Sequence, residues 1–375
     1  MRVAATRDAW SWAWTACALS AVLACACGDD ASTGDAGGAT GTDAAAGDAG
    51  VTGDGGATGS GPLADVTCDT KPPAGAPKPP PPPAYSQGMC PKLVLGRNMI
   101  KSATGDREFV LVGPKKIDPK KPLPLAFMWA WLAGDADQFV AIGMLQALTE
   151  KYHFLAAVPD PGKDVQFNWP FHLLASDARR DQEFVLFDDM LSCVNEQFPV
   201  NTDCVSSVGV SAGALFTSLL IGGRGDYLAS AIVLSGGVGG IIKPWIVPEH
   251  KLPVFVLWGG AMDQCFGILN FQQTTATLET ALMDGGHFVV ECTHNCGHAV
   301  PPFEGSSPVE PVADFILKHP YWLEPGESPY NETGLPDVYP DWCAIGIGNA
   351  VARTGMCPEG FACPPNFPSM TPPAM

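Results

Sequence analysis

Gly209-Val210-Ser211-Ala212-Gly213 is the stretch of sequence that decides the fold. It follows the apolar run Cys204–Val208 and precedes a second apolar run, Ala214–Ile221. Where a strand turns directly into a helix, the neighbouring side chains must be small, because the two elements approach each other closely. Glycine on both sides meets this need. We therefore expect a strand, a strained turn with Ser211 at its tip, and a helix.

Short apolar runs of the same kind lie on both sides of this turn, separated by loops and by stretches with helical spacing. Such runs are typical of strands buried on both faces. The clearest helical stripe is formed by Phe184, Phe187, Leu191, Val194 and Phe198. Strands that alternate with helices predict an α/β fold, with a mostly parallel sheet covered on both faces. Besides Cys204–Val208, the predicted strands are Phe109–Val112, Leu125–Ala130, Phe154–Val158, Ala231–Leu234, Val254–Trp258 and His287–Cys292.

The composition narrows the class of partner. A chain of 375 residues with 46% hydrophobic content can bury a large core. Its formal charge of -18 argues against a protein that neutralises nucleic acid phosphates or anionic lipid headgroups. We therefore expect a packed domain that binds no nucleic acid.

The first 27 residues predict an export signal. Basic residues precede an apolar run that is too short for a stable membrane span. Cys25 and Cys27 stand where this run meets polar sequence, as in the lipobox of bacterial lipoproteins. Val22-Leu23-Ala24-Cys25 is the better motif match, whereas cleavage before Cys27 leaves an even set of ten cysteines. We expect lipid anchoring at the bacterial cell envelope, with plain secretion as the alternative.

Composition also predicts the domain boundaries. Residues 28–86 are rich in Gly, Ala and Asp and then in Pro, which predicts a disordered tether that stiffens toward its end. Residues 87–325 carry the strand and helix pattern of the catalytic domain. Residues 326–375 form an extension rich in Pro and Cys, for which the sequence indicates no mechanism.

A serine hydroxyl needs a base within hydrogen-bond reach, and the base needs an acid to orient it. Where a serine sits on such a turn, acid and then base follow it on loops after later strands. Asp263 follows Val254–Trp258, and His298 follows His287–Cys292, so both fit this order. The weaker candidates are His294, His287, His172 and His250 for the base, and Asp284 and the Asp188-Asp189 pair for the acid.

The spacing of Cys292, His294, Cys296 and His298 could also indicate zinc. In an exported protein these cysteines are expected to be oxidised, so we predict no metal. Two attractive disulfides are Cys265–Cys296, which would clamp the acid and base loops together, and Cys193–Cys204. Connectivity cannot be deduced from sequence, so these pairings stay open.

From about Cys90 to Pro301 the chain resembles the polyhydroxybutyrate depolymerase and feruloyl or acetylxylan esterase group of secreted α/β-hydrolases. The resemblance implies an α/β-hydrolase fold and ester hydrolysis through an acyl-enzyme, with Ser211 as nucleophile, His298 as base and Asp263 as acid. It implies no cofactor. The matching pieces are Arg107-Glu108-Phe109-Val110-Leu111, the strand after Pro122-Leu123-Pro124, the loop Phe167-Asn168-Trp169, the helix from Asp188-Asp189, the Ser211 turn and Cys296-Gly297-His298-Ala299-Val300-Pro301.

The chain departs from this family in one loop. The backbone N–H of Ala212, at the start of a helix, is the first expected oxyanion donor. The second donor in the family comes from a His-Gly loop, but this chain has Ala130-Trp131-Leu132-Ala133-Gly134. Trp131 or Leu132 would donate instead, and Trp131 and Trp169 are candidates for the substrate pocket. The departure motivates an alternative: a surface-binding lipoprotein that has lost efficient catalysis.

Overall fold

The computed structural model describes residues 63–165, 167–299, 301–303 and 307–357. The predicted signal peptide, both lipidation candidates Cys25 and Cys27, and the tether up to residue 62 lie outside the described residues. No described helix is both long enough and apolar enough to cross a membrane.

In the part of the chain that the structure describes, nine strands form one sheet in the order β1-β2-β4-β3-β5-β6-β7-β10-β11. The pairs from β4 through β3 to β10 are parallel, and the pairs β1–β2, β2–β4 and β10–β11 are antiparallel. The strands are β1 (Gly96–Ser102), β2 (Gly105–Val112), β3 (Leu123–Trp129), β4 (Leu155–Pro159), β5 (Val200–Val210), β6 (Ser230–Leu234), β7 (Val254–Trp258), β10 (Val289–Thr293) and β11 (Cys343–Ile345); β8 (Gln264–Cys265) and β9 (Leu269–Asn270) form a separate hairpin.

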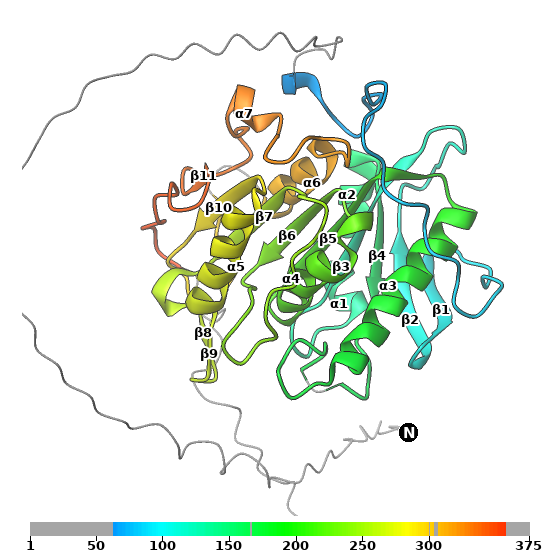
Figure 1. Ribbon diagram of the computed structural model, residues 1–375, viewed down its shortest axis with the longest axis horizontal. Coiled ribbons are helices and arrows are strands. Elements are labelled where there is room, and N and C mark those ends of the chain that lie inside the picture. The colour runs from blue at the N-terminus through cyan, green and yellow to red at the C-terminus, as the bar shows by residue number, and fades with distance from the viewer. Residues whose placement is uncertain (1–62, 166, 300, 304–306, 358–375) are drawn as a thin grey trace, which may run out of the picture. The chain divides into compact units, whose positions relative to one another are not determined.

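Helices cover both faces of the sheet (Figure 1). One core contains side chains of α3, α4 and α5, and the other contains those of α1, α2 and α6. Neighbouring strand residues alternate between the two cores: Phe127 of β3 faces the first and Met128 the second. The helices are α1 (Ala136–Ile142), α2 (Leu145–Tyr152), α3 (Asp177–Gln197), α4 (Ala212–Arg224), α5 (Phe271–Gly285), α6 (Val309–Lys318) and α7 (Tyr330–Thr333).

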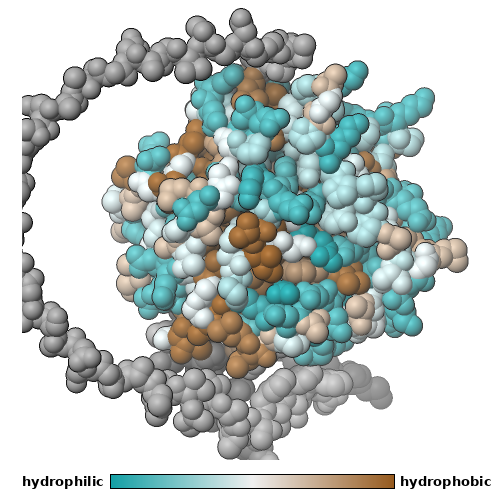
Figure 2. All heavy atoms as spheres, viewed as in Figure 1, coloured by the Kyte–Doolittle hydropathy of each residue, from teal (hydrophilic) through white to brown (hydrophobic). Residues whose placement is uncertain are grey.

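The predicted α/β fold with a mostly parallel, doubly covered sheet is confirmed, and the predicted strands correspond to β2 to β7 and β10. The strands that the sequence did not predict lie at the edges or in a loop. β1 buries only alternate residues, and β11 is three residues long, so neither has a continuous apolar run. On the face covered by α3, α4 and α5, the surface is mainly hydrophilic, with small apolar patches (Figure 2).

The last part of the predicted tether, residues 63–86, lies on the domain instead of forming a free linker. Cys68 is disulfide-bonded to Cys204 of β5. The backbone N–H and hydroxyl of Ser86 donate to the buried carboxylate of Asp189, and Tyr85 is buried. Composition alone could not show this, because the anchoring depends on single residues within a proline-rich stretch.

The predicted disulfide Cys193–Cys204 is wrong, because strand alternation separates the two cysteines. Val205 of β5 faces the core that includes Cys193 of α3, so Cys204 points to the opposite face of the sheet. On that face Cys68 lies against α6, its backbone N–H donating to the carbonyl of Leu317. Cys193 bonds instead to Cys90.

The predicted C-terminal extension contributes to the main domain. β11 pairs antiparallel with β10, and a disulfide joins Cys343 to Cys292 across this pair. The side chains of Tyr330 and Tyr339 are buried in the core on the α6 side. The part of the extension that the structure describes is therefore integral to the fold.

Four disulfides join described cysteines: Cys68–Cys204, Cys90–Cys193, Cys292–Cys343 and Cys296–Cys357. Disulfides form and persist in oxidising environments and are rare in reducing ones. The protein is therefore suited to an extracytoplasmic or secreted location.

Acid should destabilise the fold through the buried His319. Burial lowers its pKa to about 3, because the charged ring would be removed from water, and the hydrogen bond to the carbonyl of Phe315 offsets only part of this cost. The other ring nitrogen is hydrogen-bonded to the hydroxyl of Ser328. Between pH 6.5 and 3 the unfolded state binds this proton and the native state does not. The unfolding free energy should therefore fall with falling pH, by about 1.4 kcal/mol per pH unit from this group.

Urea denaturation of wild type and His319→Gln between pH 7 and pH 4.5 would test this. The difference between the two proteins isolates His319 from other titrating groups. One such group is Glu279, whose pKa burial raises to about 8 and whose effect has the opposite sign. The prediction would be contradicted if the unfolding free energies of the two proteins changed equally with pH.

Candidate functional site

Ser211 lies at the tip of the turn between β5 and α4. Its backbone has φ 55° and ψ −116°, a conformation that residues other than glycine rarely adopt. A Cβ at Gly209 would lie 2.2 Å from the carbonyl oxygen of Gly213, and a Cβ at Gly213 would lie 1.9 Å from that of Trp129. Both glycines are therefore required by the close approach of strand and helix, as the sequence predicted.

Ser211, His298 and Asp263 form one hydrogen-bonded chain. Nε2 of His298 lies 2.8 Å from Oγ of Ser211, and Nδ1 lies 2.7 Å from Oδ1 of Asp263. Asp263 is fully buried, whereas the side chain of His298 is 12% exposed. The three loops that follow β5, β7 and β10 thus bring together the three side chains that the sequence singled out.

The second oxygen of Asp263 is also fixed. Oδ2 accepts hydrogen bonds from the hydroxyl of Ser235 and from the backbone N–H of Gly259, each 2.8 Å long. Ser235 follows β6 and adopts φ 54°. Neither donor was predicted from the sequence. A sequence signal for them was present. Ser235-Gly236-Gly237 and Gly259-Gly260 are glycine-containing turns directly after predicted strands, like the turn at Ser211.

The loops that carry Asp263 and His298 pack backbone against backbone. A Cβ at Gly259 would lie 1.9 Å from the carbonyl oxygen of Gly297. The ring of Phe271, at the start of α5, stacks on the His298 imidazole with centroids 4.2 Å apart and an interplanar angle of 17°. The stacking restricts the orientation of the His298 ring, and the backbone contact restricts the position of the loop that carries it.

The competing histidines have other roles. His294 is fully buried, its Nδ1 accepts from the backbone N–H of Cys296, and burial lowers its pKa to about 4. Nδ1 of His287 is bonded to the carbonyl of Leu252. His250 stacks on Tyr321, and the backbone of His172 forms a bridge with Ile242.

The competing carboxylates also lie elsewhere. Asp284 is exposed near the end of α5. Asp188 forms an ion pair with Arg224, and burial of Asp188 raises its pKa. Asp189 is fully buried and accepts from Ser86 and Ser102. Neither carboxylate of this pair is therefore the partner of His298, whose Nδ1 is hydrogen-bonded to Asp263.

The disulfide predicted between Cys265 and Cys296 is wrong as well. Cys296 is bonded to Cys357 near the C-terminus, and Cys265 is also disulfide-bonded. The expected clamp between the acid and base loops comes instead from the Gly259–Gly297 backbone contact. Because Cys292 and Cys296 are both in disulfides, neither offers a thiolate to a metal ion.

The loop that holds Trp131 and Leu132 begins beside the Ser211 turn, since α4 abuts the end of β3 at Gly213. The side-chain amide of Asn168, which belongs to a different loop, donates to the carbonyls of Trp131 and Gly134 and so fixes the loop after β3. The indole of Trp131 packs on Phe139 of α1, with centroids 5.8 Å apart. The tryptophan therefore has a packing partner on α1.

Trp169, a predicted pocket residue, has no exposed surface. Its ring N–H donates to the carbonyl of Ala130, and the ring lies against Trp129 and Phe216. Trp169 supports the loop after β3 from within the core and does not line an open pocket. The apolar character of tryptophan suited both a pocket wall and a core, and only the fold distinguishes them.

The sheet order, the two helical layers and the turn at Ser211 define an α/β-hydrolase fold. Two solved structures described as native pOPH and native sOPH are similar to this chain. The pOPH structure has a TM-score of 0.55 at 16% identity, covering 69% of this chain and 97% of pOPH. The sOPH structure has a TM-score of 0.55 at 19% identity, covering 71% of this chain and 98% of sOPH. No family model and no curated sequence matches the chain.

Proposed function

We propose that this protein is an extracytoplasmic serine hydrolase that cleaves carboxylic esters, with Ser211 as nucleophile, His298 as general base and Asp263 as the acid that orients it. The hydrogen-bonded chain through Ser211, His298 and Asp263 carries this proposal. Its two short links place a base against the serine hydroxyl and a buried carboxylate against the base. This is the arrangement that activates a serine for attack on an acyl group.

The reaction proceeds in two halves. Nε2 of His298 takes the hydroxyl proton of Ser211 while Oγ attacks the carbonyl carbon of the ester. The tetrahedral intermediate collapses, and the alcohol leaves with the proton that His298 returns. Water then attacks the acyl-enzyme in the same way and releases the acid, which restores the Ser211 hydroxyl.

The oxyanion would be held by backbone N–H groups. Ala212 begins α4, where N–H groups lack helical partners and the helix dipole favours negative charge. The second donor is assigned to Trp131 or Leu132, in the loop fixed by Asn168 and Trp169. A backbone N–H does not depend on the His and Gly residues that the esterase family has in this loop. The different sequence of the loop in this chain is therefore compatible with catalysis.

The proposed substrates are esters of polymers, such as polyhydroxyalkanoates, or feruloyl and acetyl esters of polysaccharides. This choice rests on the resemblance of the Ser211 turn and the His298 loop to secreted esterases. Lipid attachment at Cys27 or Cys25 would hold the enzyme at the bacterial cell envelope, with residues 28–62 as the tether.

A fluorophosphonate probe tests the proposal, because such a probe reacts with activated serines. Wild type, Ser211→Ala and His298→Ala would be labelled in parallel, with Ser206→Ala as a matched control. Ser206 lies on the same strand, with its hydroxyl bonded to Ser230. We expect labelling of wild type and Ser206→Ala, none of Ser211→Ala, and at least a 100-fold slower rate for His298→Ala.

A folded wild type that resists labelling would overturn the hydrolase proposal. The surface-binding lipoprotein would then be the better reading of the chain. Folding of each protein would be verified by circular dichroism before labelling.

A further inference from the structure

A C-terminal strap, residues 343–357, holds the loop that carries His298. It pairs along β10 as β11, with Ile345 opposite Val290, and the N–H of Gly346 donates to Val289. It then doubles back, because the N–H of Gly348 donates to the side chain of Glu291 and that of Arg353 donates to the carbonyl of Thr293. The strap thus returns to the end of β10 where the His298 loop begins.

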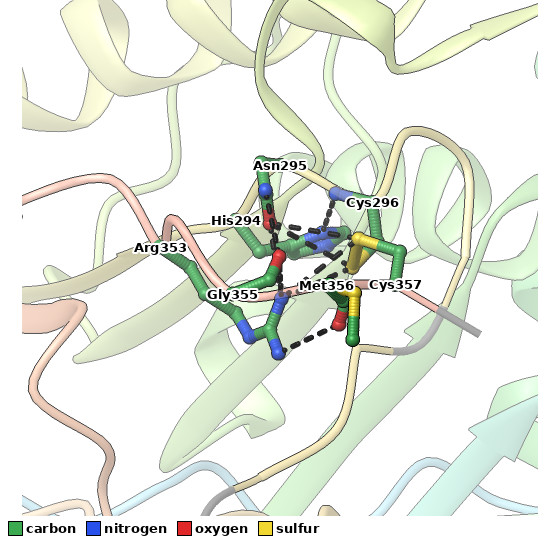
Figure 3. The surroundings of a disulfide bond; sticks show 7 residues. All are labelled: His294, Asn295, Cys296, Arg353, Gly355, Met356 and Cys357. Atoms are coloured by element: carbon green, nitrogen blue, oxygen red, sulfur yellow. Dashed lines mark hydrogen bonds between the residues drawn. A yellow bond between two sulfur atoms is a disulfide. The ribbon is translucent and has the colours of Figure 1, made fainter.

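Arg353 joins the strap to this loop (Figure 3). Its side chain is buried, and Nη1 donates to Oδ1 of Asn295 at 3.0 Å and to the carbonyl of Gly355 at 2.9 Å. Nη2 donates to the carbonyl of Met356 at 3.1 Å. Asn295 in turn donates to Gly355 at 3.0 Å. The planar guanidinium therefore connects one loop residue to two strap carbonyls at once.

A covalent bond lies beside this contact. The disulfide Cys296–Cys357 connects the residue two positions before His298 to the strap (Figure 3). Between Cys296 and His298 lies only Gly297, which adopts φ 65° and packs on Gly259 of the acid loop. A displacement of Cys296 is thus transmitted to His298 through a single residue.

The strap and the acid loop contact opposite ends of this short segment. Asn295 and Cys296 are bound to the strap, whereas Gly297 and His298 contact Gly259 and Asp263. The triad links of 2.7 and 2.8 Å tolerate little displacement, since a shift of about 1 Å can cost on the order of 100-fold in rate.

We infer that Arg353, together with the Cys296–Cys357 disulfide, is a positioning element that holds the His298 imidazole in reach of both Ser211 and Asp263. Arg353 touches none of the reacting atoms and acts through Asn295 and the loop backbone. The expected effect on turnover rests on the proposed hydrolase function. The position of His298 can be tested without that function, through its hydrogen bond to Asp263.

The first test is kinetic and uses the exported chain with a short-chain p-nitrophenyl ester. We expect Arg353→Met and the double variant Cys296→Ser/Cys357→Ser to lower kcat by about 10–100-fold and to change KM by less than about 3-fold. Arg353→Lys, which keeps the charge but not the planar fork, should lie between wild type and Arg353→Met. The matched control, Cys90→Ser/Cys193→Ser, removes a disulfide remote from the site and should stay within about 2-fold.

The second test does not depend on activity. The proton on Nδ1 of a histidine bonded to a carboxylate gives a far-downfield resonance, assigned to His298 by its loss in His298→Ala. We expect this resonance to be lost or broadened in Arg353→Met and in Cys296→Ser/Cys357→Ser, and kept in Cys90→Ser/Cys193→Ser. Arg353→Met keeps every disulfide, so it decides the matter if the cysteine variant does not fold.

The outcomes separate the two proposals. An unchanged His298 resonance or an unchanged kcat in Arg353→Met overturns the positioning role. If wild type cleaves no ester, the hydrolase proposal fails, and the resonance alone then decides whether the strap positions His298.

Discussion

Replacing Ser211 with alanine is expected to lower kcat for a short-chain ester by about 10⁵–10⁶-fold. The substitution removes the only group in the hydrogen-bonded chain that can form an acyl-enzyme. Ala212 and the loop after β3 keep their backbone N–H groups, so a residual rate above that in water should survive.

The fold should be unaffected by this change. Alanine at position 211 faces the same positive φ as serine, so the strain of the turn stays nearly equal. Within the described residues, the hydroxyl of Ser211 forms one side-chain hydrogen bond, to His298. Thermal unfolding within about 2 °C of wild type would establish that the lost turnover is chemical.

Steady-state kinetics on Ser211→Ala and Ser206→Ala, freshly purified from separate cultures, would measure the effect. Ser206→Ala should keep turnover within about 3-fold, because its hydroxyl bonds to Ser230 within the sheet. More than 1% residual activity in Ser211→Ala would show that another nucleophile performs the reaction.

The sequence predicted those features that depend on local pattern. The strands β3 to β7 and β10 are buried on both faces and appear as apolar runs, and the Ser211 turn carries its own glycines. Asp263 and His298 followed from their order after strands. The strands and the Ser211 turn follow from residues close together in the chain, whereas Asp263 and His298 follow from their positions after strands and from their order along the chain.

Features that depend on long-range contacts were not predicted. The pairing of Cys296 with Cys357 spans 61 residues, and that of Cys68 with Cys204 spans 136. Trp169 was assigned to a pocket because an aromatic residue in a loop suits either a pocket or a core. Ser235 lies 28 residues from Asp263, and only the adjacency of β6 and β7 brings it to the carboxylate.

Replacing Asp263 with asparagine should lower kcat by about 10⁴-fold through the tautomer of His298. In wild type, Oδ2 accepts from the Gly259 N–H, a donor that cannot reverse its role. An asparagine side chain would keep its oxygen at that position and direct its NH₂ group toward Nδ1 of His298. The imidazole would then have to accept at Nδ1 and carry its proton on Nε2, where it could no longer receive the proton of Ser211.

The matched control is Asp284→Asn, which removes one negative charge from an exposed position near the end of α5 and should leave kcat within about 2-fold. Both variants have the same net charge, so a difference between them cannot come from the overall electrostatic field. A crystal structure of Asp263→Asn with His298 unmoved would assign the loss to the tautomer and not to a displaced ring. A decrease of less than 10-fold would contradict the role of Asp263, because the Gly259 N–H leaves the asparagine no favourable orientation that restores the wild-type tautomer.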